Sequence, residues 1–142
     1  MRTAIRHEFV AMIPDHLDEG VVYVSMPYAT AVHLCCCGCG HEVVTPLHPL
    51  QWSLILNGET ISLTPSIGNW SFPCRSHYWI RAGQVHRARP FSDSEISGVR
   101  AKERALLSDH YEPQVRAAPQ EAALSAESGW TRLTRWFRRS FR

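Results

Sequence analysis

Four of the five cysteines of this 142-residue chain lie in one short segment, Cys35-Cys36-Cys37-Gly38-Cys39. The fifth, Cys74, stands three residues before His77. Zinc binds thiolate sulfur and imidazole nitrogen, and structural zinc sites usually take their ligands from two short segments of this kind. Cysteines this crowded do not suit ordinary disulfide geometry, so their spacing favours a metal. The sequence therefore predicts one Zn²⁺ ion between the two segments.

Strand geometry helps to choose among the clustered cysteines. Side chains alternate between the two faces of an extended segment, so Cys36 would point away from its neighbours. Four protein ligands would close the tetrahedron and make the metal structural, whereas three would leave a place for water and for chemistry. The ligands that we expect are Cys37, Cys39, Cys74 and His77, with Cys35 as the substitute.

Several other side chains are candidates for catalysis, and His33, Ser66 and Ser76 are the main ones. His33 shares a strand face with two of the cysteines and could be a ligand, a base, or a partly buried strand residue without a chemical role. Ser66 and Ser76 could act as nucleophiles if a base such as His33 reaches them, although serine is also common in turns. A cysteine that the metal leaves unused is an alternative nucleophile. Glu42 could be a base or a solvated carboxylate.

Short β-strands must position these residues. Between Glu8 and about Ala88, apolar residues alternate or form short blocks between turn-forming residues, which is typical of strands. Asn57-Gly58 predicts a tight hairpin, and residues 81–84 predict a second one. Residues 64–70 lack strand alternation and are interpreted as a loop. The expected strands are residues 8–13, 20–25, 30–36, 52–56, 59–63, 77–81 and 84–88.

The character of the sequence changes after Pro90. Residues 92–95, Ser-Asp-Ser-Glu, have the form of a capping box and predict a helix that ends near Tyr111. Residues 112–129 contain two prolines and are interpreted as a linker. Aromatic and leucine side chains at intervals of three and four residues predict an amphipathic helix in the tail.

The predicted fold class is mainly β (α+β). It is a small antiparallel β domain stapled by a zinc site and followed by one or two C-terminal helices. The predicted organisation is a zinc-stapled β domain at residues 1–90, a helix packing on it at 91–111, a linker at 112–129 and a basic amphipathic tail helix at 130–142.

Charge and hydropathy restrict the classes of partner. Residues 1–90 carry six arginines, no lysine and six acidic residues, so this part does not have the basic character of a nucleic-acid binder. The five arginines of residues 130–142 are a local feature, and we expect the tail to contact its own domain, a partner or a membrane surface. The N-terminus has no apolar signal region, and no segment has the roughly 20 apolar residues that cross a bilayer. We expect a cytoplasmic protein that needs no small-molecule cofactor.

Three motifs resemble those of one bacterial protein family. They are residues 33–40, His-Leu-Cys-Cys-Cys-Gly-Cys-Gly, residues 65–70, Pro-Ser-Ile-Gly-Asn-Trp, and residues 73–80, Pro-Cys-Arg-Ser-His-Tyr-Trp-Ile. Over roughly residues 8–90 the chain is similar to a small family of metal-binding proteins. Its members tend to be encoded beside ubiquitin-like proteins and ThiF-like activating and conjugating enzymes. The resemblance implies that these proteins are the partners.

Such pathways commonly need a protease that trims the ubiquitin-like protein or removes it. Our leading hypothesis is therefore a zinc-containing, deubiquitinase-like peptidase with its nucleophile near Ser66 or Ser76. The alternative is a non-catalytic zinc-binding adaptor that recruits a substrate or the conjugation enzymes.

Overall fold

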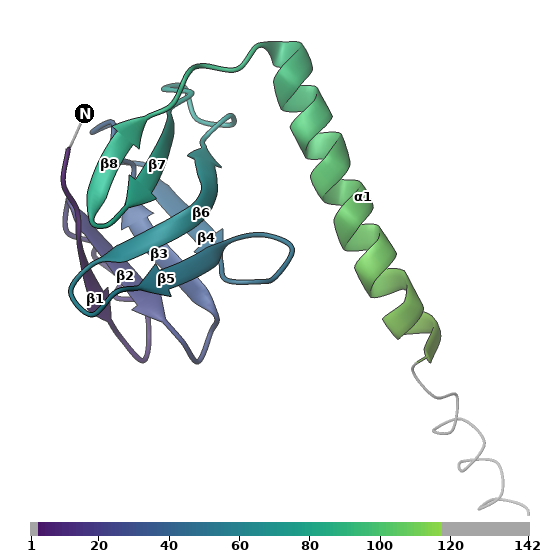
Figure 1. Cartoon of the computed structure of the whole chain (residues 1–142), viewed down its shortest axis with the longest axis horizontal. Helices are drawn as coiled ribbons and strands as arrows, with labels where there is room; N and C mark the ends of the chain where they lie inside the picture. Colours follow the sequence, from purple (N-terminus) through teal and green to yellow (C-terminus); the bar gives the residue numbers. More distant parts are fainter. Residues whose placement is uncertain (1–2, 118–142) are drawn as a thin grey trace, which may run out of the picture. The chain divides into compact units, whose positions relative to one another are not determined.

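Two four-stranded sheets form the β domain of the protein (Figure 1). The computed structural model describes residues 3–117, with side chains described as far as residue 111. The first sheet has the order β1-β2-β3-β4 and the second the order β5-β6-β7-β8. Paired neighbours are antiparallel except for β1 and β2, which are parallel. The mainly β fold with a C-terminal helix is confirmed. The strands are β1 (Arg6–Phe9), β2 (Val21–Ser25), β3 (Thr30–Leu34), β4 (Glu42–Pro46), β5 (Ser53–Leu56), β6 (Ile61–Gly68), β7 (His77–Arg81) and β8 (Gln84–Arg87).

One apolar core joins the two sheets. Val22 and Val24 of β2 belong to the same buried cluster as Ile61 and Leu63 of β6. Leu63 is fully buried, so its truncation to alanine would cost about 2–5 kcal/mol in unfolding free energy. This shared core holds the two sheets together.

Both predicted hairpins are present. Between β5 and β6, the Asn57 carboxamide oxygen accepts the Thr60 N–H at 3.0 Å, and Gly58 takes a φ of 98°. The loop spans residues 57–60 and is longer than the two-residue turn that Asn-Gly suggested, because the ladder begins at the Leu56–Ile61 pair. Between β7 and β8, the two loop residues both have positive φ, the geometry of a tight hairpin turn.

Two parts of the strand prediction are wrong. β4 was not predicted, although Val43 and Thr45 are buried while Glu42 and Val44 are exposed, in strict alternation. The segment interpreted as a loop at residues 64–70 lies largely within β6. A register irregularity between Leu63 and Ile67 accommodates the proline, and strand pairing with β7 resumes beyond it.

Helix α1 (Asp93–Ala117) begins with the predicted capping box. The Ser92 N–H donates to the Glu95 carboxylate at 2.8 Å, and the Glu95 N–H donates to the Ser92 hydroxyl at 3.3 Å. The helix extends beyond Tyr111, so residues 112–117 of the predicted linker are helical. Proline was taken as a stop signal, but a proline in a helix can kink it without ending it.

The N-terminal part of α1 contacts the β domain. Ile96 is buried, and the Arg100 guanidinium donates to the Ser71 hydroxyl at 3.0 Å. Residues up to Glu103 form one compact unit, and the part of α1 from Arg104 onward belongs to a second. Along residues 3–117, no helix combines the length and the apolar character needed to span a membrane. The rest of the predicted linker and the predicted tail helix lie outside the described residues.

Candidate active site and metal centre

A serine and a histidine meet on the outer face of the second sheet. Gly68 of β6 pairs directly with His77 of β7, so their side-chain positions share one face. Ser66 lies two residues before Gly68 and is on that face as well. Its hydroxyl oxygen is 2.9 Å from Nε2 of His77. The strand register thus brings together two residues that are eleven positions apart in the sequence.

The second ring nitrogen of His77 fixes the protonation pattern. Nδ1 lies 2.6 Å from the backbone carbonyl oxygen of Arg89. Because a carbonyl can only accept a hydrogen bond, Nδ1 must carry the proton. Nε2 of the neutral ring is then the acceptor for the Ser66 hydroxyl proton. This is the arrangement in which a histidine can act as a general base.

Aromatic rings enclose the imidazole. The centroid of the His77 ring is 4.9 Å from that of Trp70 and 4.6 Å from that of Phe91, and the side chain is only 8% exposed. Trp70 and Phe91 stack on each other at 5.2 Å. Trp70 lies so close to Gly68 that a Cβ atom there would be 2.2 Å from the indole ring. Glycine at position 68 is therefore required for this packing, which holds the imidazole in one orientation.

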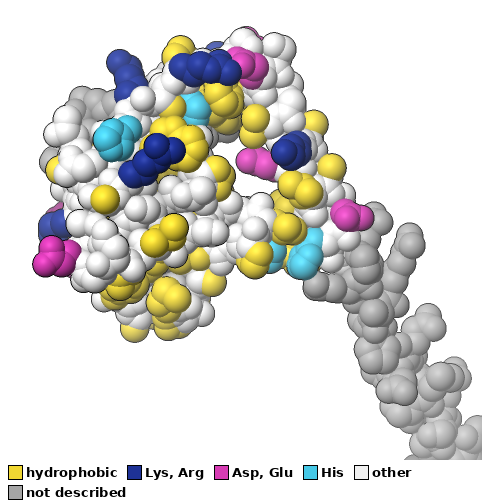
Figure 2. Space-filling model, viewed as in Figure 1, with side chains coloured by type: hydrophobic (Ala, Val, Ile, Leu, Met, Phe, Trp, Pro, Cys, Tyr) yellow, Lys and Arg dark blue, Asp and Glu magenta, His cyan; other side chains and the backbone are white. Residues whose placement is uncertain are grey.

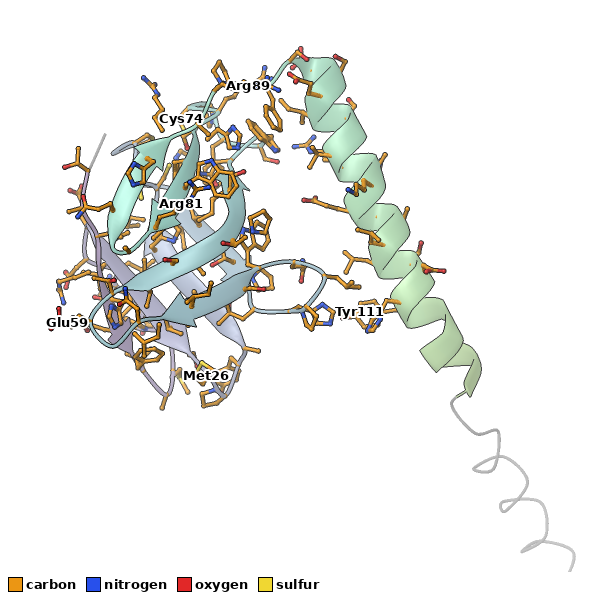
Figure 3. The ribbon with its side chains drawn as sticks, in the orientation of Figure 1. Met26, Glu59, Cys74, Arg81, Arg89 and Tyr111 are labelled. Carbon is orange, nitrogen blue, oxygen red and sulfur yellow. The ribbon has the colours of Figure 1, made fainter. Side chains whose placement is uncertain are left out.

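The cysteines of the two motifs form a compact cluster at the same end of the second sheet, where Figure 3 labels Cys74 and Arg89. Neighbouring sulfur atoms are 3.4, 4.0 and 3.6 Å apart. Four sulfur atoms around one zinc, each about 2.3 Å from it, would be about 3.8 Å from one another. The cluster is therefore suited to one tetrahedral metal ion. Its members, whose sulfur atoms all lie within 4.8 Å of each other, are Cys35, Cys37, Cys39 and Cys74.

This cluster differs from the expected ligand set at one position. Cys35 takes the fourth place, while His77 is bonded to Ser66 and to the Arg89 carbonyl. Cys36 is buried in the core and is not a member of the cluster, as strand alternation suggested. Gly38 and Gly40, with φ values of 90° and 76°, turn the chain around the cluster.

The cysteine thiols differ in acidity. Burial raises the pKa of Cys35, and it raises that of Cys37 to about 12. At Cys74 burial acts in the same direction, but hydrogen bonds from Ser76 and other neighbours outweigh it and lower the pKa to about 6. The Cys35 and Cys37 thiols, whose pKa values are raised, would ionise only beside a strong positive charge, and a coordinated divalent cation would supply that charge.

Ser76 and His33, the other catalytic candidates, are connected to this cluster and to the core. The Ser76 hydroxyl is 3.1 Å from the Cys35 sulfur and accepts from the Asn69 amide at 2.9 Å. His33 is fully buried, and its Nε2 is 2.9 Å from the Tyr78 hydroxyl. Burial lowers the pKa of His33 to about 4, so this ring is neutral at physiological pH. Neither residue is hydrogen-bonded to Ser66.

Sequence reasoning missed three contributors to the site. Trp70 and Phe91 had no spacing that linked them to His77. Arg89 contributes its backbone carbonyl, which carries no residue-type signal at all. These contacts exist only in the folded chain, where Trp70 and the residues after β8 pack against the imidazole.

A cleft of about 1180 Å³ borders His77 and the cysteine cluster. Cys74, Arg75, Arg87 and Phe91 are among its lining residues. Ser66 does not line it and is half-buried on its own strand. Figure 2 shows hydrophobic, histidine and basic (Lys or Arg) side chains close together on the face in view.

Comparison with known proteins identifies a family. No curated protein and no solved structure matches the chain. The model of the family described as "Bacterial ubiquitination-like system serine protease (BubE)" matches residues 9–88, more than half of the chain. The matched segment contains all five cysteines together with Ser66 and His77. The resemblance seen in the sequence is thereby confirmed, and the chain belongs to the BubE family of serine proteases of bacterial ubiquitination-like systems.

Proposed function

We propose that this protein is a serine peptidase acting on the ubiquitin-like protein of its pathway, with Ser66 as nucleophile and His77 as general base. The 2.9 Å contact between the Ser66 hydroxyl and His77 Nε2 carries this proposal. It supplies the activated serine that the family description requires.

The hydrogen bonds assign the proton movements. Ser66 Oγ attacks the scissile carbonyl while His77 Nε2 takes the hydroxyl proton. When the tetrahedral intermediate collapses, the imidazolium gives that proton to the departing amine and leaves an acyl-Ser66 ester. Water then attacks the ester while His77 Nε2 takes one of its protons. When this second intermediate collapses, the bond to Ser66 Oγ breaks, the imidazolium returns the proton to Oγ, and the carboxylic acid product leaves and ionises.

The Arg89 carbonyl takes the position that an aspartate occupies in a Ser-His-Asp triad. It fixes the ring tautomer and orientation through the 2.6 Å bond to Nδ1, but it brings no full negative charge. The imidazolium is therefore stabilised less than in a triad. The packing of Trp70 and Phe91 against the ring compensates in part by fixing its geometry.

We further propose that the cysteine cluster holds a structural Zn²⁺ ion. Four thiolates would complete its coordination and leave no position for a reacting water. The metal would fix the loop after β3 to the segment that leads into β7, and so hold that segment in place ahead of His77. Its role is to stabilise this end of the domain, and the peptidase steps belong to Ser66 and His77.

Covalent labelling combined with cleavage tests the peptidase. A fluorophosphonate probe should modify the purified protein once, and peptide mass spectrometry should place the modification on Ser66. The same preparation should cleave a C-terminally extended ubiquitin-like protein of the pathway. Ser66→Ala should abolish both signals, while Ser53→Ala, at an exposed position on β5, should preserve them.

Ser76→Ala separates this proposal from the other serine candidate. Because Ser76 contacts Cys35 and Asn69, its loss should affect metal retention more than labelling. Labelling at Ser76, or undiminished cleavage by Ser66→Ala, would contradict the assignment.

One observation favours the non-catalytic adaptor. The large cleft lies beside the cysteine cluster, and Ser66 does not line it. An adaptor would bind the ubiquitin-like protein without cleaving it, and Ser66→Ala would bind as tightly as the unchanged protein. Cleavage that depends on Ser66 excludes this alternative.

A further inference from the structure

Strand β6 has an unpaired stretch of edge beside Ser66. β6 runs from Ile61 to Gly68, but its ladder with β5 covers only Ile61 to Thr64 and ends at the Ser53–Thr64 pair. Before Ser53 the chain leaves this sheet, and Trp52 pairs with Leu47, next to the first sheet. In the described part of the chain, no strand pairs with Pro65–Gly68 on the β5 side (Figure 1).

The backbone groups of Gly68 face this open edge. Along a strand, the N–H and C=O groups of successive residues point alternately to its two neighbours. Asn69 donates its N–H to the Ser76 carbonyl at 2.9 Å, which is the β7 side. The N–H and C=O of Gly68 therefore point to the opposite side, where β5 no longer runs.

An exposed strand edge can pair with an extended peptide. Paired strands lie about 4.8 Å apart, so the carbonyl groups of an added strand would pass close to Ser66. The Ser66 side chain stands on the outer face of the sheet beside that position, bonded to His77. The open edge and the candidate nucleophile therefore belong to one surface.

We propose that the substrate binds as an added β-strand along the open edge of β6, in line with β5, with main-chain hydrogen bonds to Gly68. The occupant is the extended C-terminal segment of the ubiquitin-like protein. This inference rests on the proposed peptidase function and adds how that substrate is held. Because β5 already occupies the edge as far as Thr64, the added strand is short, and its end nearest Ser53 turns away from the sheet.

Main-chain recognition has a signature that side-chain recognition lacks. In a peptide copying the C-terminal segment of the ubiquitin-like protein, each residue can be N-methylated in turn. Methylation at an amide that bonds to β6 should lower kcat/KM by about 5- to 10-fold, the effect of one lost hydrogen bond. Methylation of the residues on either side of it, whose amides point away from β6, should change kcat/KM by less than about 2-fold.

Hydrogen exchange locates the same contact on the protein. In Ser66→Ala, which binds the peptide without cleaving it, exchange of the Gly68 amide should slow when the peptide is added. The backbone amide of Asn69, which already donates to the Ser76 carbonyl, is the internal control, and its exchange should not change.

The outcomes separate the two proposals. If the peptide is cleaved in a Ser66-dependent manner but the methylation series is flat and the Gly68 amide is unaffected, the added strand is wrong and the peptidase stands. If no cleavage occurs, the peptidase is wrong, and protection of the Gly68 amide alone decides whether the edge binds the peptide.

Discussion

The cysteine cluster and the Ser66–His77 pair depend on the same short segment, residues 74–77, but they are assembled differently. Three of the clustered cysteines come from one loop after β3, and Cys74 approaches from the second segment. The Ser–His pair requires the register between β6 and β7, the irregularity between Leu63 and Ile67 that includes Ser66, and the contacts of residues 89–91 with the ring. The cluster therefore depends mostly on residues close together in the sequence, whereas the Ser66–His77 pair depends mostly on long-range contacts.

This difference predicts a one-way dependence. Loss of the cluster should release the segment that carries His77, so both regions should fail together. Damage to the pair should leave the cluster intact, because no cysteine of the cluster is hydrogen-bonded to Ser66 or His77 in the described residues. Substitutions in the two regions should reveal this asymmetry.

Cys74→Ser should give the largest loss. The proposed metal would lose one of four ligands, and metal-binding energy in such sites is also folding energy. We expect less than half an equivalent of zinc, a melting temperature lower by more than about 10 °C, and no detectable cleavage. Metal analysis and calorimetry measure these effects.

Cys36→Ala is the matched control for that variant. Cys36 is buried in the core outside the cluster, so its truncation should cost some stability and keep the metal. Full zinc content and activity in Cys74→Ser would contradict the structural role of the cluster.

His77→Gln should lower cleavage by at least about 10³-fold while zinc content stays at one equivalent. Glutamine can still bond to the Arg89 carbonyl, but it cannot serve as a base. His86→Gln, at an exposed position on β8, should be neutral. Loss of zinc from His77→Gln would instead support His77 as a ligand. It would also contradict the expectation that damage to the Ser66–His77 pair leaves the cysteine cluster intact.

Gly68→Ala should lower kcat by about 10- to 100-fold with the metal retained. The new methyl group would overlap the Trp70 indole at 2.2 Å, and displacing that ring removes one wall of the imidazole site. Gly98→Ala, in α1 with nothing within 4 Å of the added atom, is the control and should slightly stabilise the helix. Normal turnover by Gly68→Ala would show that the Trp70 packing does not position His77.

Glu95→Gln should give the smallest effect. The Arg89 guanidinium bonds to Glu95 at 2.6 Å and, with bonds from Ser92, lowers the pKa of that carboxyl to about 2. We expect a few-fold loss of activity at neutral pH, because Arg89 also provides the carbonyl that orients His77. Glu103→Gln, further along α1, should have no such effect.

The contribution of Glu95 to stability should depend on pH, because folding lowers the pKa of its carboxyl. A carboxyl whose pKa is lowered by folding stabilises the fold above its unfolded value, near 4.5, and loses that contribution as the pH falls toward 2. The difference in melting temperature between Glu95→Gln and the unchanged protein should therefore shrink over that range. A constant difference would contradict a charge-dependent cap.

Much of the fold could be predicted from local patterns in the sequence. The two hairpins and the capping box were predicted because each depends on residues close together in the chain. The prediction failed where long-range pairing overrides local preference. Pro65 and Gly68 look like loop residues, yet β6 passes through both because β7 supplies the partner beyond the bulge.

The sequence by itself determined that cysteines from two segments could meet around a metal, because crowded thiols and glycines define such a loop locally. It also identified Ser66 as a candidate nucleophile. Only the tertiary structure decided that His77 faces Ser66 and that Cys35 completes the cluster. Whether His77 points toward the cysteines or toward Ser66 depends on the β6–β7 register and on the Arg89 carbonyl. Both are long-range features, and the spacing of nearby residues does not encode them.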